Sequence, residues 1–267
     1  MTNKWQLYEQ KILKGELPET LKKYNPILLQ LLFNRGIESE EKIDQFLNPS
    51  LKYLPKITQL HHIKKTVEII NKAIKQKKKI YIHGDYDVDG MSAVAILWDY
   101  LYNVRGANVM PYIPDRVDEG YGLSESSLTY IYDQGAQLVI TVDCGIRDYE
   151  IIEKWKKKGM EFVVTDHHQL PDQLPDCPIV HPDLSVGKVF SGVSGATIAW
   201  LLVCSFEYVD NSTKFSYRNV KGLDLVAISV LSDVMDSRGI NRHLQSYGLE
   251  ELRTSNRKGL VALLTFL

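Results

Sequence analysis

The middle of the chain alternates between short apolar runs and longer amphipathic stretches. The amphipathic stretches place apolar residues at helical spacing, whereas the runs are bounded by turn residues and have the length of strands. The strand-like runs cover residues 79–82, 108–113, 137–142, 161–165 and 178–181, and helix-like stretches separate the first four of them. Strands that alternate with helices predict a parallel sheet with helical crossovers. We therefore expect an α/β fold, with a parallel sheet of about five strands flanked by helices.

Helical patterns dominate on both sides of this sheet region. Before it, an apolar stretch follows Asn25-Pro26, an N-cap with proline at the first helical position, and a second short helix begins after Ser39. After it, residues 196–206, 223–234 and 249–267 have helical spacing. The sequence thus predicts an N-terminal helical cap over residues 1–60 and a main domain over residues 61–267, with a helical C-terminal part.

Composition and charge are ordinary for a globular protein. Hydrophobic residues make up 44% of the chain, and the formal net charge is −1, so contact with nucleic acid would need a local patch. The lysine runs at 75–79 and 154–158 end predicted helices, where cations complement the helix dipole. No apolar run reaches the ~18–20 residues of a membrane span, and the N-terminus lacks a signal-peptide core. Together with three scattered cysteines, these features predict a cytoplasmic protein that does not enter a membrane.

Acidic and histidine residues gather directly after four of the predicted strands, at residues 83–90, 143–145, 166–168 and 181–183. The carboxyl ends of parallel strands lie at one edge of the sheet, where open α/β folds bind ligands. Several carboxylates in a small volume repel one another unless something neutralises them. Mixed Asp and His ligands suit Mn²⁺, Mg²⁺ or Zn²⁺. Carboxylate-rich ligation favours an open, catalytic pair of ions over a closed structural zinc site.

Each of these motifs taken alone also has an ordinary structural explanation. The turn at 83–90 could be a solvated acidic loop, Asp143 a helix cap, and the histidines at 167 and 168 surface residues. An EF-hand is excluded because no glutamate stands twelve residues along, and a P-loop because there is no Gly-Lys-Ser/Thr. Asp233, near the end of an apolar helix, needs either a metal or an arginine partner, Arg238 or Arg242.

Taken together, the motifs resemble the DHH phosphoesterase superfamily, and within it the RecJ-like single-strand-specific exonucleases. Residues 84–90 are similar to the first motif and residues 142–145 to the second, and Asp166-His167-His168 is the signature that names the superfamily. Residues 224–234 resemble the fourth motif. The loop 114–123 and the small-residue segment 191–196 are also similar, so the resemblance extends from about residue 30 to the end.

This resemblance implies two Mn²⁺ or Mg²⁺ ions at the edge of the sheet. It assigns one ion to His83, Asp87 and Asp143, and the other to Asp89, Asp143, His167 and Asp233. Two ions about 3.5–4 Å apart can activate a water and stabilise the attacking and leaving oxygens of a phosphodiester. The same resemblance gives catalytic roles to three further residues: Asp85 as an additional ligand or a residue behind the ligands, Asp166 as the residue that orients a ligating histidine, and His168 as the residue facing the scissile phosphate.

Substrate contacts are also implied, each with an alternative. Arg116 resembles the residue that holds a 5′-phosphate, but it could pair with a neighbouring acid, Asp115 or Glu119. Tyr121 either stacks on a base or packs its loop. His181 stands where related chains often carry asparagine, so it is either a substrate contact or neutral variation. Arg242, after the fourth motif, is the remaining expected contact.

The activity implied by the resemblance is a 5′-to-3′ exonuclease that acts on the 5′ end of single-stranded DNA and releases 5′-mononucleotides. Its setting would be DNA repair and recombination, with single-strand-binding or repair proteins as partners. Two alternatives are a phosphoesterase for short oligonucleotides or small nucleotides, and a non-catalytic replication scaffold. The full set of ligands from His83 to Asp233 argues against the scaffold. We expect residues 61–267 to form the DHH catalytic domain, without a DHH-associated C-terminal domain or an OB-fold.

Overall fold

A computed structural model describes residue 8 and residues 18–266, so part of the expected cap and the last residue of the helix expected at 249–267 lie outside the described residues. The chain divides into two compact units, Met1–Ser50 and Leu51–Leu267. The first unit contains a 3₁₀ turn, Glu19–Leu21, and the helices α1 (Pro26–Phe33) and α2 (Glu40–Leu47). Asn25 and Ser39 cap these helices by accepting the N–H groups of Ile27 and Lys42.

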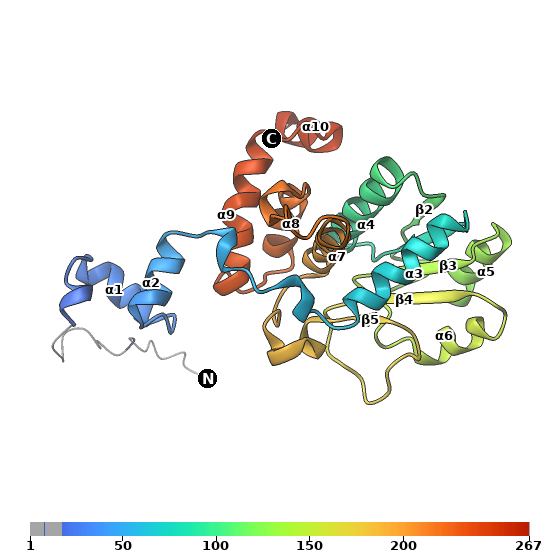
Figure 1. Ribbon diagram of the computed structural model, residues 1–267, viewed down its shortest axis with the longest axis horizontal. Helices are drawn as coiled ribbons and strands as arrows, with labels where there is room; N and C mark the ends of the chain where they lie inside the picture. The colour runs from blue at the N-terminus through green and yellow to red at the C-terminus, as the bar shows by residue number, and fades with distance from the viewer. Residues whose placement is uncertain (1–7, 9–17, 267) are drawn as a thin grey trace. The chain divides into compact units, whose positions relative to one another are not determined.

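The second unit is built on a five-stranded sheet. The strands are β1 (Ile80–His83), β2 (Val109–Tyr112), β3 (Leu138–Val142), β4 (Glu161–Thr165) and β5 (Ile179–Val180). Their order is β2-β1-β3-β4-β5, and every pair is parallel (Figure 1). The predicted fold class is therefore confirmed, and all five strands end at the same edge.

Helices cover both faces of this sheet, as Figure 1 shows. One hydrophobic cluster joins alternate strand residues such as Ile82 and Ile140 to α3 (Ile63–Lys75), α4 (Val88–Asp99), α7 (Gly195–Asp210) and α8 (Leu223–Ser232). The other joins Tyr81 and Val139 to α5 (Glu125–Asp133) and α6 (Tyr149–Lys156). Because successive residues of a strand point to opposite faces, β1 and β3 contribute to both clusters. They are the buried centre of the fold.

Short helical turns complete the connections of the second unit. A π-helical turn, Tyr100–Val104, extends α4, and 3₁₀ turns cover Leu51–Tyr53, Ile57–Gln59, Pro182–Leu184, Val186–Lys188 and Tyr217–Asn219. The helix expected to begin at residue 91 begins at Val88 instead, because the Asp87 carboxylate accepts the N–H of Gly90 at 2.9 Å and caps it. No described helix has both the length and the apolar character that a membrane crossing requires.

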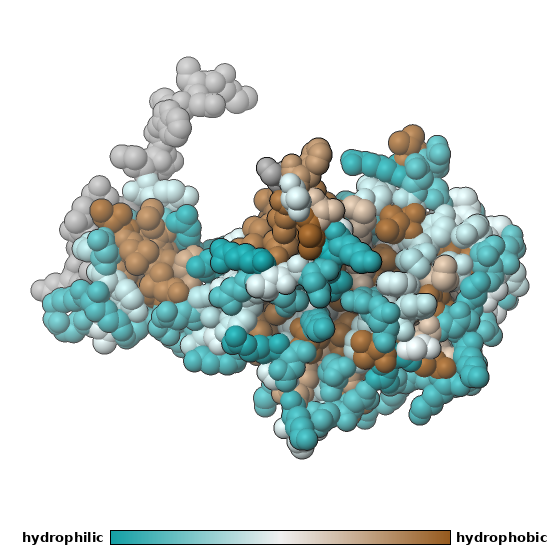
Figure 2. Space-filling view, turned by 90° about the horizontal axis from the view of Figure 1, so that it is seen from above, coloured by the Kyte–Doolittle hydropathy of each residue, from teal (hydrophilic) through white to brown (hydrophobic). Residues whose placement is uncertain are grey.

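The prediction of one continuous helix over residues 249–267 is wrong. The structure has two helices, α9 (Gly239–Arg253) and α10 (Lys258–Phe266), separated by residues 254–257. The chain breaks there because Ser255 and Arg257 turn inward to the buried carboxylate of Asp224, at 2.8 and 3.0 Å. Beyond the break, α10 exposes its apolar side chains, which form a brown patch in Figure 2.

Candidate metal centre

Carboxylate and imidazole atoms converge at the carboxyl edge of the sheet. Within the described residues they form three overlapping groups, in each of which the ligand atoms lie within 4.8 Å of one another. The groups are Asp85, Asp87 and Asp143; Asp143, His167 and His168; and Asp89, His167 and Asp233. All of these residues are among those that the sequence indicated. They come from the ends of β1, β3 and β4, the first turn of α4 and the end of α8.

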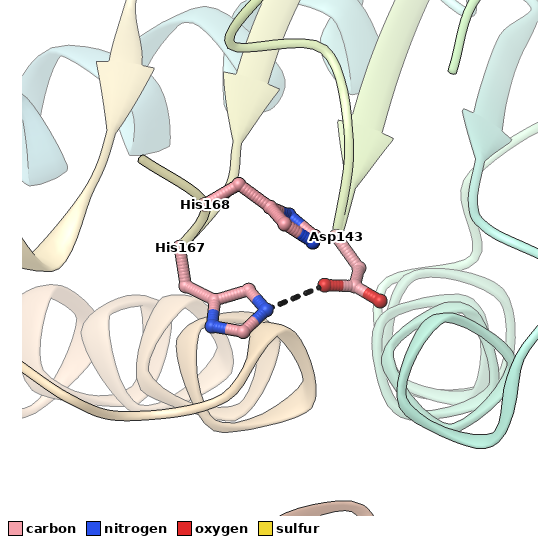
Figure 3. Close-up of side chains that lie close together, drawn as sticks. All are labelled: Asp143, His167 and His168. Atoms are coloured by element: carbon pink, nitrogen blue, oxygen red, sulfur yellow. Dashed lines mark ion pairs between the residues drawn. The ribbon is translucent and has the colours of Figure 1, made fainter. Parts of the chain in front are cut away.

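Asp143 lies at the centre of this arrangement, directly after β3. Its backbone is in the left-handed region, with φ +61°, a conformation that aspartate adopts more readily than most residues. The turn carries its carboxylate toward the end of β4, where His167 Nε2 lies 3.1 Å from Asp143 Oδ1 (Figure 3). Figure 3 also shows His168 beside this pair, on the loop that follows β4.

Gly195, the first residue of α7, faces Asp143 from the helical side. A Cβ atom at this position would lie 2.6 Å from Asp143 Cβ and Cγ, so no larger residue fits without moving the carboxylate. The small-residue segment 191–196 was part of the family resemblance, but no function was predicted for Gly195. Its signal was the pair of glycines at 192 and 195 just before an apolar helix.

Asp89 is almost completely buried and is held by the N-terminus of α7. It accepts the N–H groups of Gly195 and Ala196 at 2.8 and 2.7 Å, and the hydroxyl of Ser229 in α8 at 2.7 Å. The positive end of the α7 dipole also favours a carboxylate at this place. Asp89 Oδ2 also lies 3.6 Å from Nε2 of the His167 imidazole.

Asp233 follows the last turn of α8 and faces the same imidazole, with its Oδ2 3.8 Å from His167 Nε2. The next residue, Val234, has φ +53° and is highly exposed. Of the two arginines considered as partners for Asp233, Arg238 forms its ion pair with Asp236. The structure thus places Asp233 against His167 rather than against that arginine.

His83, which the resemblance assigned to the first ion, belongs to none of the three groups. Its ring is fully buried and stacks on Tyr112, with 5.2 Å between centroids, and Cys144 Sγ lies 3.8 Å from its Nδ1. Burial lowers the pKa of His83 to about 4, so the imidazole is neutral. Its Nε2 has no hydrogen-bond partner in the described part of the chain, as is also true of Asp85 Oδ1. The role of His83 as a ligand stays a prediction.

The charges at the centre are strongly coupled. Burial raises the pKa of Asp143 to about 8. Burial alone would lower the pKa of His167, but the carboxylates of Asp143 and Asp89 outweigh it and raise the value to about 9. Burial also raises the pKa values of Asp85 and Asp233. Burial therefore disfavours the ionised form of these carboxyl groups, and a cation bound beside them would favour it.

His168 is held in place by three neighbours. Its Nδ1 lies 2.8 Å from Asp166 Oδ1, and this hydrogen bond raises the pKa of the imidazole. The Tyr121 hydroxyl is 3.0 Å from the same nitrogen. His181 is fully buried beneath, where Nδ1 accepts the N–H of Asp183 and Nε2 donates to the His168 carbonyl at 2.8 Å. Both nitrogens of His181 therefore contact the main chain, and its role as a substrate contact stays a prediction.

Two further predicted contacts lie on other elements. Arg116 is exposed on the loop after β2, and its guanidinium lies 5.3 Å from the ring centroid of Tyr86, in the acidic turn. The neighbouring acids are engaged elsewhere: Glu119 accepts the Tyr112 hydroxyl, and Asp115 accepts main-chain N–H groups of its own loop. Arg242 lies half-buried in the first turn of α9. Their contacts with substrate stay predictions.

The donor set fits a hard divalent cation. The ligand atoms are carboxylate oxygens and imidazole nitrogens. Such a donor set suits Mn²⁺ or Mg²⁺ and differs from the cysteine-rich donor set of a zinc site. Buried Asp85 Oδ1 and His83 Nε2, which lack protein partners among the described residues, would gain one from such an ion. Fold and site together define a class: α/β proteins with a carboxylate–histidine centre at the carboxyl edge of a parallel sheet.

Within that class, the sequence model of the DHH family, N-terminal domain, matches residues 79–230. This is more than half of the 267 residues, and the chain belongs to the DHH family. The matched segment runs from the residue before β1 to the last turn of α8, so it contains every ligand candidate except Asp233. The family predicted from the motifs is confirmed.

Individual relatives are single-stranded-DNA-specific exonucleases named RecJ. The chain is 33% identical to RecJ of Bacillus subtilis (strain 168) over 243 residues, which are 90% of this chain and 30% of that protein. A crystal structure of exonuclease RecJ bound to manganese matches with a TM-score of 0.67 and 32% identity, over 78% of this chain and 51% of that one. RecJ from Thermus thermophilus, in complex with Mn²⁺, matches with a TM-score of 0.73 and 29% identity, over 92% and 34%. The chain thus spans about a third of the length of the curated relative.

Proposed function

We propose that this chain is the catalytic part of a metal-dependent phosphodiesterase that removes 5′-mononucleotides from the 5′ end of single-stranded DNA. The observation that carries the proposal is the convergence of Asp and His ligand atoms around Asp143 at the carboxyl edge of the sheet. The similarity to the single-stranded-DNA-specific exonuclease RecJ over 90% of this chain supports the substrate, and the direction is the one that the family resemblance implies. A setting in DNA repair or recombination in the cytoplasm, beside single-strand-binding or repair proteins, belongs to the same proposal.

The cofactor in this proposal is a pair of Mn²⁺ or Mg²⁺ ions. Asp87, Asp143 and His83 would hold one ion, with Asp85 adjacent, and the residues around His167 would hold the other: Asp89, Asp143 and Asp233. Such ions lower the pKa of water and offset the negative charge of a phosphodiester. The related RecJ structures with Mn²⁺ support this choice of metal.

The residues behind and beside the ligands have separate tasks. Asp166 accepts the main-chain N–H groups of Ile146, His167 and His168, so it fixes the loop that carries both histidines. The hydrogen bond with Asp166 raises the pKa of the His168 imidazole and so favours its protonated form, which can donate a hydrogen bond to a phosphate oxygen. His181 holds the His168 main chain from below. His168 is thus the candidate contact to the scissile phosphate.

The loop after β2 supplies the contacts to the DNA end. Arg116 is exposed and its guanidinium lies over Tyr86 beside the acidic turn, so it can bind a terminal 5′-phosphate through paired hydrogen bonds. Tyr121, between two glycines with positive φ, presents a partly exposed ring that can stack on a base. Arg242 is the remaining candidate for a backbone phosphate.

The test is the release of nucleotides from a 3′-labelled single strand with Mn²⁺. We expect stepwise shortening of a 5′-phosphorylated strand from its 5′ end, and none for Asp143→Ala. A matched control is Asp176→Ala, because Asp176 is an exposed acid that pairs with Lys156 and belongs to none of the ligand groups. If a folded, Mn²⁺-treated parent shortens no strand, or if Asp143→Ala is as active as the parent, the proposal is wrong. If nucleotides are released only from short oligonucleotides, the proposed substrate is wrong but the proposed metal-dependent hydrolysis of phosphodiesters stands.

A further inference from the structure

Asn241 connects two loops that meet at the candidate metal centre. It lies in the first turn of α9 and is 4% exposed. Its side-chain nitrogen donates to the main-chain carbonyl of Gly192 at 2.8 Å and to that of Asp236 at 3.0 Å. The two carbonyls lie far apart in sequence, so a single amide group joins the segment before α7 to the segment after α8.

Each of these segments positions one member of the same ligand group. Gly192 precedes Gly195, whose N–H, with that of Ala196, holds Asp89. Asp236 follows Asp233 by three residues, in the turn that leaves α8. Asp89 and Asp233 share a group with His167, so the spacing of the two carboxylates depends on how these loops are tied together.

The turn after α8 needs support from outside. Val234 has φ +53°, a conformation that is an outlier for a β-branched residue. The Met235 N–H closes the helix by donating to the Val230 carbonyl at 3.0 Å, a helix ending that usually has glycine where Val234 stands. Such strain persists only where surrounding contacts fix the backbone. The bond from Asn241 to Asp236 is one such contact.

The side-chain oxygen of Asn241 indicates that a contribution to stability is not a sufficient reason for an asparagine at this position. Its Oδ1 is buried and has no hydrogen-bond partner within the described part of the chain. A buried acceptor without a partner lowers stability, and an apolar residue of similar size would avoid that loss. What asparagine supplies in return is a nitrogen with two hydrogens, both used to join the loops.

We propose that Asn241 is a positioning residue that fixes Asp233 relative to Asp89 and thereby sets the affinity of the centre for a divalent ion. This inference rests on the proposed function, because it assumes that these carboxylates bind metal. Asn241 itself touches neither ion nor substrate. Its effect is exerted through the two main-chain carbonyls that it holds.

The test measures Mn²⁺ binding directly, by electron paramagnetic resonance of the free ion. Asn241→Asp keeps the shape but loses both donors, and Asn241→Leu loses all polar atoms. The matched control is Gln245→Leu: Gln245 is also a buried amide on α9, but it donates to the Ser237 hydroxyl and does not join the loops. We expect both Asn241 variants to bind one Mn²⁺ roughly 10-fold more weakly, which is the size of effect seen when residues that orient metal ligands are replaced. In Gln245→Leu the affinity should change less than about 3-fold.

Amide hydrogen exchange of the metal-free proteins provides the second measurement. Exchange should become faster at residues 191–197 and 233–237 in the Asn241 variants, while the strands keep the protection of the parent. Unchanged Mn²⁺ affinity in both variants, or an equal loss in Gln245→Leu, would overturn the inference while leaving the proposed function intact. A folded parent that binds no Mn²⁺ would overturn both.

Discussion

The two halves of the candidate centre are fixed by different means. In the strand-end half, Asp143 and the histidines follow β3 and β4, which pair directly, and the Asp143 N–H still donates to the Thr165 carbonyl at 3.0 Å. In the helical half, Asp89 and Asp233 are placed by contacts among α4, α7, α8 and α9. The strand-end half inherits its geometry from the register of the sheet, whereas the helical half depends on side chains and N–H groups distant in sequence.

The largest effect should come from a change that pushes one half against the other. In Gly195→Ala the added methyl group would meet the Asp143 carboxylate, displacing either that residue or the start of α7. We expect nuclease activity to fall on the order of 100-fold, because shifts near 1 Å at a reacting site have effects of that size. The measurement is the initial rate of nucleotide release at saturating Mn²⁺. Gly259→Ala, in open space on α10, is the control and should keep the parent rate.

A smaller effect is expected from loosening the helical half alone. Ser229→Ala removes the hydroxyl that Asp89 accepts at 2.7 Å but leaves both N–H donors of α7. We expect Mn²⁺ affinity to fall about 10-fold, at the lower end of losses from such supporting residues. Ser205→Ala is the matched control, because Ser205 is equally buried in α7 but bonds only within its helix, to Leu201. Equal Mn²⁺ affinity in the two variants would show that Asp89 does not need its hydroxyl donor.

The smallest effect concerns the stability of the metal-free protein as the pH changes. The folded protein raises the pKa of His167 from 6.5 to about 9, so it binds that proton more tightly than the unfolded chain does. This contribution is complete below pH 6.5 and is lost as the pH rises through about 9. The raised pKa of Asp143, about 8, acts in the same direction. The unfolding temperature in a chelator should therefore fall between pH 6.5 and 9, and His167→Gln should flatten the decline. A rising profile would contradict the assignment.

The strand-end half could be predicted from sequence because its signal is local. A buried β-rich run followed at once by Asp143, or by Asp166-His167-His168, places those residues at a strand end without knowledge of the fold. The parallel register then brings adjacent strand ends together. The same reasoning predicted the five strands and the crossover helices α4, α5 and α6.

In the helical half, the sequence predicted only the two acidic residues, Asp89 and Asp233. Gly195, Ser229 and Asn241 were not recognised as supports, because each acts on a residue that lies far away in the chain. The helix α9 was missed at its start for a related reason: residues 239–248 are mostly polar, and their inward-facing amides and histidine do not form an apolar stripe. Burial of such residues depends on tertiary partners that no local pattern encodes.

The way in which Asp89 is held also bears on how the centre fills and empties. Its three donors are two main-chain N–H groups and a hydroxyl, all carried by helices packed into the core, and none of them is a charged group. Their hold does not depend on a bound cation, in contrast to small zinc domains that unfold when a chelator is added. Chelation should therefore leave this carboxylate in its place, so that exchange of one ion for another is limited by binding and release rather than by refolding.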